Sequence, residues 1–182
     1  MTARSTTNDY SEFRIHKLHY KLNADGASWA AFGCTGKLER SYEVKQITKK
    51  CEGIVKKNIT KPTGNGTLNI SAHAVVEAIR KMQAMVTANN VTAQGTADFP
   101  SFRIKCEVEN EDGEVMYQEY PNLCLNEAPT VTIDNDADEV AEVEYSIAMA
   151  TDTAGYMFYE AFAADLTNAT IATVDLPTTF AG

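Results

Sequence analysis

Alternation of apolar and polar residues at every second position dominates the chain, and this period is typical of strands that bury one face. The clearest case runs from Phe102 to Val108, where apolar residues alternate with charged ones. Asn110-Glu111-Asp112-Gly113 then supplies a turn signal, and Val115 begins a second arm, so a β-hairpin is predicted here. Further strands are predicted at 13–22, 67–72, 130–133, 143–149, 156–162 and 169–174, with a turn at 152–155.

One segment has a helical period instead. Val75, Ile79, Met82 and Val86 recur at helical spacing, and polar residues fill the positions between them. A single helix over about residues 74–86 must cover a sheet to bury its apolar stripe. The predicted fold is therefore mostly β: a β-sandwich or partly closed β-barrel flanked by this one helix.

A second hairpin is predicted at about residues 38–59, and it is poor in core positions. Apolar residues are sparse there, and lysines occupy many of the remaining positions: Lys45, Lys49, Lys50, Lys56 and Lys57. A hairpin with so few apolar residues is not stable by itself, so it either projects into solvent or is completed by another subunit. Pro62 and Gly64-Asn65-Gly66 are expected to turn the chain back toward the sheet.

The length of 182 residues fits a single domain, with flexible arms expected at 1–11 and 176–182. The chain contains no run of about 18 apolar residues, so no transmembrane helix is predicted. The N-terminus lacks the apolar stretch of a secretory signal, so a soluble protein made in the cytoplasm is expected. The four cysteines are scattered without any Cys-x-x-Cys pair, and we expect free thiols that behave as small buried hydrophobes.

Charge is divided unevenly along the chain. The formal net charge is −9, yet all 16 lysines and arginines precede residue 106. The remainder, from Cys106 to Gly182, holds 17 acidic residues and no lysine, arginine or histidine. Such a division favours a subunit with oppositely charged surfaces and head-to-tail contacts, and the simpler alternative is a solvated acidic surface without a specific partner.

No constellation of residues predicts catalysis, a metal or a cofactor. His16 and His19 are three residues apart in a predicted strand, which would place them on opposite faces. Residues 134–139 resemble the start of a calcium loop, but Glu139 stands where the glycine is needed, so an acidic hairpin tip is expected. No Ser/His/Asp or Cys/His arrangement is recognisable. We therefore expect no catalytic residues, no metal and no cofactor, and a protein that is not an enzyme.

Direct nucleic-acid binding is also not expected. The basic stretch from Lys37 to Lys61 contains Tyr42 as its single aromatic residue, and the whole protein is acidic. Lysines on such a hairpin can instead meet carboxylates of a neighbouring subunit.

The order of these features resembles the major tail protein, or tail-tube protein, of siphovirus-type bacteriophages and related prophages. The resemblance covers most of the chain: the basic hairpin near 42–59, the strand 67–72 that leads into the helix 74–86, the hairpin that follows Phe102, the connection 122–133, and the strands ending near Phe162. It lies in the general pattern rather than in a short motif. From the sequence, which continues to Gly182, we expect no additional C-terminal immunoglobulin-like domain of the kind that some members carry.

The resemblance implies a structural subunit that self-assembles into stacked, hexameric rings around an electronegative lumen that conducts DNA. Its implied partners are copies of itself, other tail proteins such as the tape measure and the tail terminator, and genomic DNA that passes without specific binding; no membrane is involved. The implied location is the virion tail tube, assembled in the bacterial host cytoplasm. From the charge pattern, we predict inter-ring contacts through Lys49, Lys50, Lys56 and Lys57.

Two alternatives belong to other classes. The first is a β-sandwich binding module for a carbohydrate or a receptor at a phage tail tip, which would present an exposed aromatic cluster. The aromatic residues of the C-terminal half instead follow strand alternation: Tyr117, Tyr120, Tyr156, Phe158, Tyr159 and Phe162. The second is a small hydrolase, which would need a pocket containing carboxylates with shifted pKa values.

Overall fold

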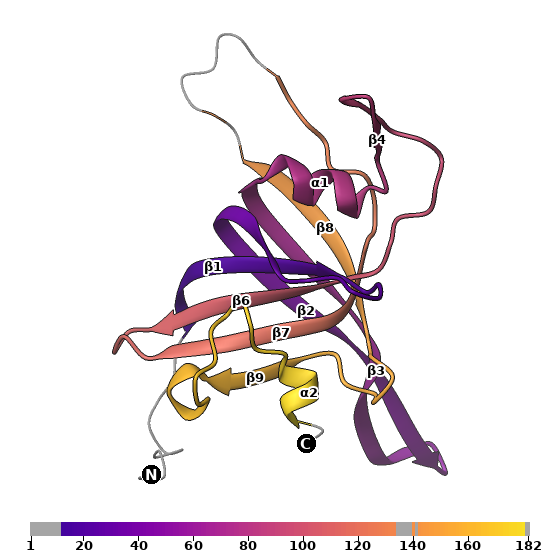
Figure 1. Cartoon of the computed structure of the whole chain (residues 1–182). Helices are drawn as coiled ribbons and strands as arrows, with labels where there is room; N and C mark the ends of the chain where they lie inside the picture. The colour runs from indigo at the N-terminus through magenta and orange to yellow at the C-terminus, as the bar shows by residue number, and fades with distance from the viewer. Residues whose placement is uncertain (1–11, 134–139, 141, 181–182) are drawn as a thin grey trace.

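A six-stranded β-barrel forms the body of the protein (Figure 1). The computed structural model describes residues 12–133, 140 and 142–180, except for the side chains of residues 13, 51 and 56. The main sheet has the order β6-β1-β2-β3-β8-β7-β9, and pairing of β6 with β7 closes the barrel. The strands are β1 Glu12–Leu22, β2 Ala30–Cys51, β3 Ile54–Ala74, β4 Val86–Ala88, β5 Val91–Ala93, β6 Phe102–Asn110, β7 Val115–Leu125, β8 Val143–Ala150 and β9 Tyr159–Phe162; the helices are α1 Val76–Met82, the short 3-10 helix η1 Ala163–Asp165 and α2 Leu176–Phe180.

The barrel interior is filled by the alternating apolar residues of its strands, which confirms the mostly β fold class. Tyr20, Phe32, Ile104, Tyr120 and Ile147 come from five different strands, and each is at most 2% exposed. The predicted hairpin of β6 and β7 forms around residues 111–114, and Gly113 has a φ of 79°, which a glycine adopts without steric cost. Closure of the barrel removes most sheet edges and goes further than the partial closure expected from the sequence.

The single long helix is shorter than the predicted 74–86. Helix α1 ends at Met82 because Ala84 adopts a φ of 53°, and the chain then continues into strand β4 at Val86. Met82 of the predicted stripe is buried against the barrel and Ile79 packs beside it, together with the buried Ala78, which the stripe did not include. Val86 belongs to the small β4–β5 hairpin and is 67% exposed, so only part of the stripe is used.

Four predictions of local structure are wrong in whole or in part. Residues 130–133 form no strand, and Ile133 is 89% exposed, so this alternating segment has no sheet to pair with among the described residues. Residues 169–174 form turns because the hydroxyl of Thr173 accepts the amide of Thr170 and competes with strand pairing. The strand predicted at 156–162 is limited to β9, and Gly64-Asn65-Gly66 lies inside β3 instead of forming a turn.

A second, smaller apolar cluster lies outside the barrel. Tyr117 and Tyr159 on the outer face of β7 and β9 pack with Ile171, Val174 and Leu176 of the C-terminal segment. Residues 176–180, expected to be a flexible tail, therefore form helix α2 with a buried first residue. The expected flexible arm at 1–11 and the expected acidic tip at 134–139 lie outside the described residues.

The three cysteines whose side chains the structure describes are free thiols but differ in burial. Cys106 is buried in β6 and Cys124 is half-buried, whereas Cys34 is exposed, contrary to the expectation of a buried hydrophobe. Among the described residues, no helix has the length and apolar character needed to cross a membrane.

Candidate assembly surfaces

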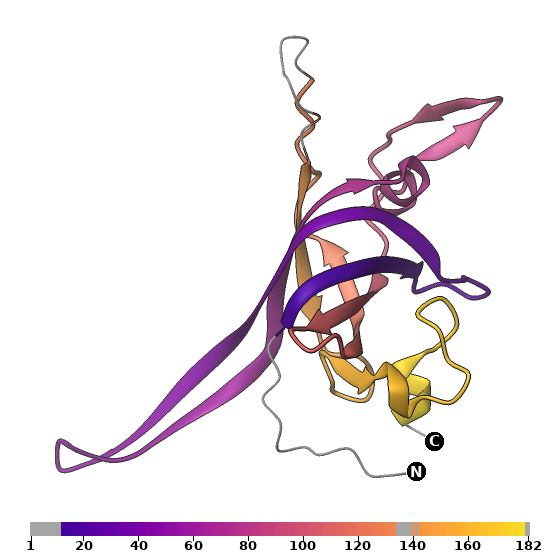
Figure 2. The same cartoon turned by 90° about the vertical axis from the view of Figure 1, so that its left-hand side faces the viewer.

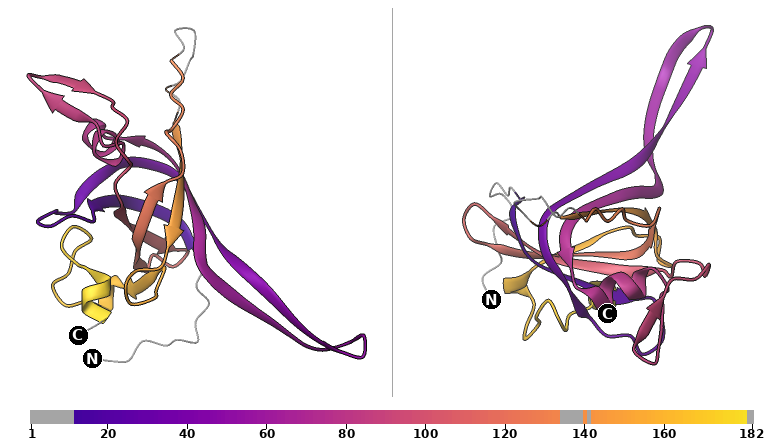
Figure 3. Two further views of the ribbon diagram at one scale, coloured as in Figure 1. Left: turned by 90° about the vertical axis from the view of Figure 1, so that its right-hand side faces the viewer. Right: turned by 90° about the horizontal axis from the view of Figure 1, so that it is seen from above.

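Strands β2 and β3 extend far beyond the barrel as a two-stranded arm, which we define as residues 43–62 (Figures 2 and 3). β3 pairs with β8 only over 65–72, and β2 pairs with β1 only over 30–33. Beyond these positions, the two strands of the arm pair only with each other within the described part of the chain. Glu52 and Gly53 form the tip, both with positive φ. The prediction of a projecting hairpin is confirmed, although the arm is slightly shorter than 38–59 and is set further along the chain.

The arm leaves the barrel at a bend built from glycines. A register shift between Tyr42 and Val44 marks the bend, and Gly64 has a φ of 87°. A Cβ on Gly66 would collide with the carbonyl oxygen of Ser41 and would lie 2.7 Å from Cε of Met149. The Gly-Asn-Gly sequence therefore allows two strands to bend and approach closely, where the sequence alone suggested a turn.

Like charges face each other across the arm. Lys45 is directly opposite Lys61, and Lys49 is directly opposite Lys57. The Ile47–Ile59 pair lies between them, and the side chain of Ile47 is 45% exposed. Like charges at directly opposite positions of a sheet are destabilising. An isoleucine side chain that stays exposed to water contributes little hydrophobic stabilisation. This face of the arm is therefore unfavourable in an isolated subunit and fits a negatively charged partner with an apolar centre.

The four predicted contact lysines all belong to the arm. Lys49, Lys50 and Lys57 are exposed, and the side chain of Lys56 lies outside the described part. Lys50 is opposite Val55, so it is not part of the lysine-pair face. The pattern of the sequence did not predict the Lys45–Lys61 pair, because these two lysines become opposite only through the strand register, which the sequence does not specify. Other exposed apolar side chains on the arm are Val44, Ile54 and Val55.

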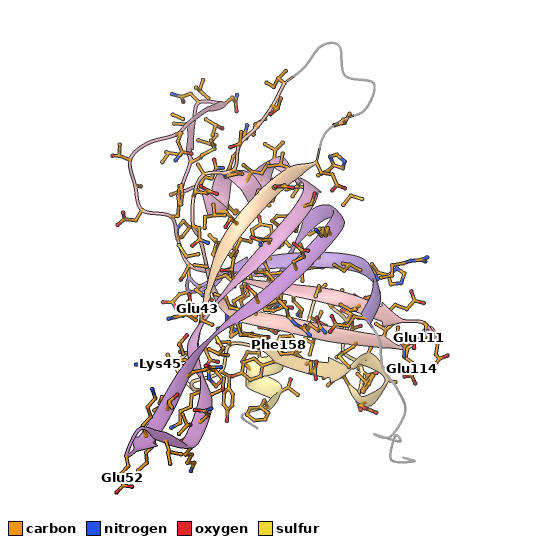
Figure 4. All side chains as sticks on the ribbon, turned by 180° about the vertical axis from the view of Figure 1, so that it is seen from behind. Glu43, Lys45, Glu52, Glu111, Glu114 and Phe158 are labelled. Atoms are coloured by element: carbon orange, nitrogen blue, oxygen red, sulfur yellow. The ribbon has the colours of Figure 1, made fainter. Side chains whose placement is uncertain are left out.

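An acidic surface lies at the tip of the β6–β7 hairpin, on a different side of the molecule from the arm (Figure 4). Asn110 organises this tip, because its Oδ1 accepts the backbone N–H groups of Asp112 at 3.1 Å and of Glu114 at 2.7 Å. Glu111 and Asp112 are exposed and form no ion pair with any described residue. We define the acidic surface as Glu111, Asp112 and Glu114; the charges of Glu111 and Asp112 are not neutralised by ion pairs with the described residues.

Carboxylates nearer the barrel are paired internally. Glu107 lies 3.4 Å from Nζ of Lys17, and Glu109 contacts the imidazole of His16. A register shift between Ile15 and Lys17 interrupts the alternation of β1. His16 therefore reaches Glu109 on the outer face, where His19 also lies opposite Lys105, so the prediction that the two histidines occupy opposite faces is wrong.

The barrel has a seam where β1 and β2 diverge. Pairing of these strands stops at Gly33, and a hollow of about 410 Å³ opens between Glu12–Ile15 of β1 and Thr35–Leu38 of β2. Strand β2 thus has an unpaired edge within the described residues. Such edges can accept a strand from another chain.

A partly exposed aromatic cluster lies beside helix α2. The rings of Tyr156, Tyr159 and Phe180 lie 5.3 to 5.7 Å apart, and Tyr156 and Phe180 are 46% and 64% exposed. The hydroxyl of Tyr159 donates to Asp152 at 2.6 Å, which fixes the turn next to the cluster. Strand alternation explains the burial of Tyr120, but it does not explain the exposure of Tyr156.

Another hollow, about 570 Å³, is lined by polar residues that include Lys21, Asn23, Arg103 and Asp152. Among the described residues there is no cluster of three or more histidine, cysteine or acidic side chains that could hold a metal ion.

Comparisons with known proteins gave structural similarities only. No protein-family model matches the chain, and no curated protein matches it by sequence. The chain is similar to several solved structures, including three at 12 to 14% identity. The first is the cap that terminates the tube of the anti-feeding prophage, with 14% identity, 90% of this chain and 99% of that chain covered, and a TM-score of 0.45.

The second is the baseplate of the anti-feeding prophage, solved with sixfold symmetrisation. The identity is 12%, the match covers 86% of this chain and 97% of that chain, and the TM-score is 0.40. The third is the sheath/tube terminator of the extracellular contractile injection system PVC in its extended state. The identity is 13%, the match covers 83% of this chain and 97% of that chain, and the TM-score is 0.39. At these identities and TM-scores the likeness carries no functional conclusion.

Proposed function

We propose that the protein is a structural subunit of a phage-like tail tube that self-assembles into stacked rings, with the arm as its contact between subunits. The observation that carries this proposal is the lysine-pair face of the arm, with Lys45–Lys61 and Lys49–Lys57 on either side of the Ile47–Ile59 pair, of which Ile47 is exposed. A surface that is destabilising in the free subunit gains favourable partners when it meets carboxylates.

Copies of the same chain supply those carboxylates. The acidic surface at the β6–β7 tip and the arm lie on different sides of the subunit, so a contact between them joins two copies head to tail (Figure 4). A heterologous contact of this kind generates rings or filaments rather than a closed two-fold dimer. The unpaired edge of β2 offers a second place for contact between neighbours.

The charge of the chain suits a conduit for DNA. An acidic wall repels phosphates, so that the polymer slides, whereas a basic wall would retain it through counterion release. The base-free segment from Cys106 onward carries 17 carboxylates, and we propose that part of it lines the lumen of stacked, hexameric rings. In this proposal the arm's lysines are neutralised in contacts between subunits and are not available to DNA. The further partners in this proposal are a tape measure protein and a tail terminator protein. The proposed location is the virion, and the proposed role does not include catalysis.

Negative-stain electron microscopy of the purified protein tests the assembly. We expect hollow rods or rings for the natural sequence and their loss in Lys49→Glu/Lys50→Glu, because the reversal places carboxylates against carboxylates. The matched control is Arg80→Glu/Lys81→Glu on α1, which makes the same change in net charge away from the arm and should still assemble. Normal rods from the arm variant would contradict the arm contact, and single particles at every concentration would contradict the tube.

The aromatic cluster favours one alternative, a binding module for carbohydrate. Two exposed rings, Tyr156 and Phe180, offer an apolar platform next to the carboxylate of Asp152. This alternative predicts a monodisperse protein that is retained on a polysaccharide column, and Tyr156→Ala should remove the retention. Assembly into rods without retention would exclude the alternative.

A further inference from the structure

A row of ionisable side chains crosses the outer face of the barrel beneath the C-terminal segment. Lys105 of β6 is directly opposite His19 of β1 on one side and Glu119 of β7 on the other, and Glu119 is opposite Tyr159 of β9. Lys105 and Glu119 are both 0% exposed. An acid and a base buried side by side lose their hydration, and only nearby polar groups can compensate for this loss.

Those polar groups belong to three consecutive residues of the C-terminal segment. Lys105 donates to the carbonyl oxygen of Val174, and Glu119 accepts the backbone N–H of Leu176 at 2.9 Å. Asp175, between them, lies 3.4 Å from both Lys21 and Arg103. The side chain of Asp175 and the main chain on either side of it are thus held by ionisable groups of the barrel.

The hydrogen bonds at this site do not fully replace the hydration that Lys105 and Glu119 lose on burial. Oε1 of Glu119 is buried and accepts no hydrogen bond, and the nearest guanidinium nitrogen of Arg103 lies 3.6 Å away. The indole ring of Trp29 covers Nζ of Lys105 at 3.9 Å, which provides a cation–π contact but keeps water away. The buried pair therefore depends on the segment above it, and the segment depends on the pair.

We propose that residues 170–180 form a strap that opens and closes over the outer face of β7 and β9, with the protons on Lys105 and Glu119 controlling the equilibrium. Opening would expose Tyr117 and Tyr159, which the strap covers through Ile171 and Leu176. The strap lies within one subunit, so the inference does not depend on tube assembly. The charged and titratable groups that face the site are His19, Lys21, Arg103, Lys105, Glu119, Tyr159 and Asp175.

The direction of the pH response follows from burial. Burial raises the pKa of Glu119 to about 7, against the stabilising amide of Leu176 and the nearby cations. Its contribution to closure is therefore full below the ordinary value of 4.5 and is lost as the pH rises through 7. Burial lowers the pKa of Lys105 to about 8, so its contribution is full above the ordinary 10.5 and is lost as the pH falls through 8. Closure is accordingly weakest between about pH 7 and 8.

Hydrogen exchange of the full chain, measured by mass spectrometry at pH 5.5 and 7.5, tests the strap. After correction for the intrinsic pH dependence of exchange, we expect amides of 171–180 to exchange about tenfold faster at pH 7.5 than at pH 5.5. Amides of β6 serve as the internal reference and should show no such change. An ordinary salt bridge, with its carboxylate ionised above about pH 4.5 and its amine charged below about pH 10.5, would leave exchange nearly unchanged between these two pH values. Exchange that is unchanged or slower at pH 7.5 would overturn the proposal.

A double variant assigns the response to the buried pair. Lys105→Met/Glu119→Gln removes both charges and keeps an acceptor for the amide of Leu176, so the difference between the two pH values should disappear. The matched control Lys37→Met/Glu39→Gln removes an exposed ion pair of 2.9 Å and should retain the difference. A response that persists in the buried variant would overturn the role of the pair. If that variant does not fold, the comparison of the natural protein at two pH values still decides whether the strap opens.

Discussion

The guanidinium of Arg40 lies 2.8 Å from the carboxylate of Glu12 and joins β2 to β1 along the seam where the two strands have no backbone pairing. The same guanidinium donates to Gln118 at 2.9 Å and to Tyr120 at 3.2 Å, and it lies 4.6 Å from the ring of Phe158. One side chain thus connects β1, β2 and β7 with the chain leading to β9, so side-chain contacts replace the missing backbone hydrogen bonds.

Replacing this arginine should weaken the whole barrel. In Arg40→Met, the buried amide of Gln118 and the buried hydroxyl of Tyr120 lose a charged partner, and we expect the free energy of unfolding to fall by about 2 to 3 kcal/mol. Chemical denaturation followed by circular dichroism measures this change. The exposed residue Lys37 provides the control, since Lys37→Met should change stability by less than about 0.5 kcal/mol. Equal stability of the two variants would show that the seam does not need Arg40.

The bend at the base of the arm predicts a severe effect of one methyl group. In Gly66→Ala, the new Cβ meets the carbonyl of Ser41 and the methyl of Met149, and backbone cannot move away as a flexible side chain can. We expect a loss of about 3 kcal/mol or more, measured as a lower denaturation midpoint. Gly95→Ala is the matched control, because nothing lies within 4 Å of its added Cβ and it should be nearly neutral. A fully stable Gly66→Ala protein would contradict the close approach at this bend.

Period-2 patterning predicted most of the barrel strands with one buried face, but not the part of β2 that begins at Ala30 and buries Phe32. β6 and β8 have apolar residues at alternate positions, and the structure buries those residues. The same reasoning failed for 130–133, where alternation occurs without a neighbouring strand to pair with. Local pattern specifies which face of a strand can be buried, but pairing depends on contacts between residues that are distant in sequence.

The candidate surfaces were predictable in composition and not in arrangement. Lysine enrichment and a shortage of apolar residues identified the projecting arm, because such a segment cannot be held by a core of its own. The opposition of Lys49 to Lys57 depends on strand register, which is set by the tip at Glu52-Gly53 and by the bulges. The burial of Lys105 was also not predictable, since the strap that covers it follows almost 70 residues later, where the sequence predicted a strand at 169–174 and a flexible arm from 176 onward.

The register of the arm leads to a prediction that separates stability from assembly. Lys49→Glu replaces a repulsive pair with an attractive one opposite Lys57, so the isolated subunit should gain about 0.5 kcal/mol while assembly weakens. Denaturation of the dispersed subunit and light scattering measure the two effects. Lys50→Glu makes the same change in charge opposite Val55 and should weaken assembly without stabilising the subunit. A stability gain in both variants would contradict the observed register.

The thiols of Cys106 and Cys34 should differ sharply in reactivity. Burial raises the pKa of Cys106 to about 12, so at pH 8 its thiol remains protonated, and it is also completely inaccessible to reagents. Cys34 is exposed on β2. Because the thiolate is the reactive form, iodoacetamide at pH 8 should alkylate Cys34 within minutes and leave Cys106 unmodified until the protein is denatured. Peptide mass spectrometry before and after addition of guanidinium chloride provides the measurement. Modification of Cys106 in the native protein at a rate close to that of Cys34 would show that the barrel opens far more readily than its filled interior implies.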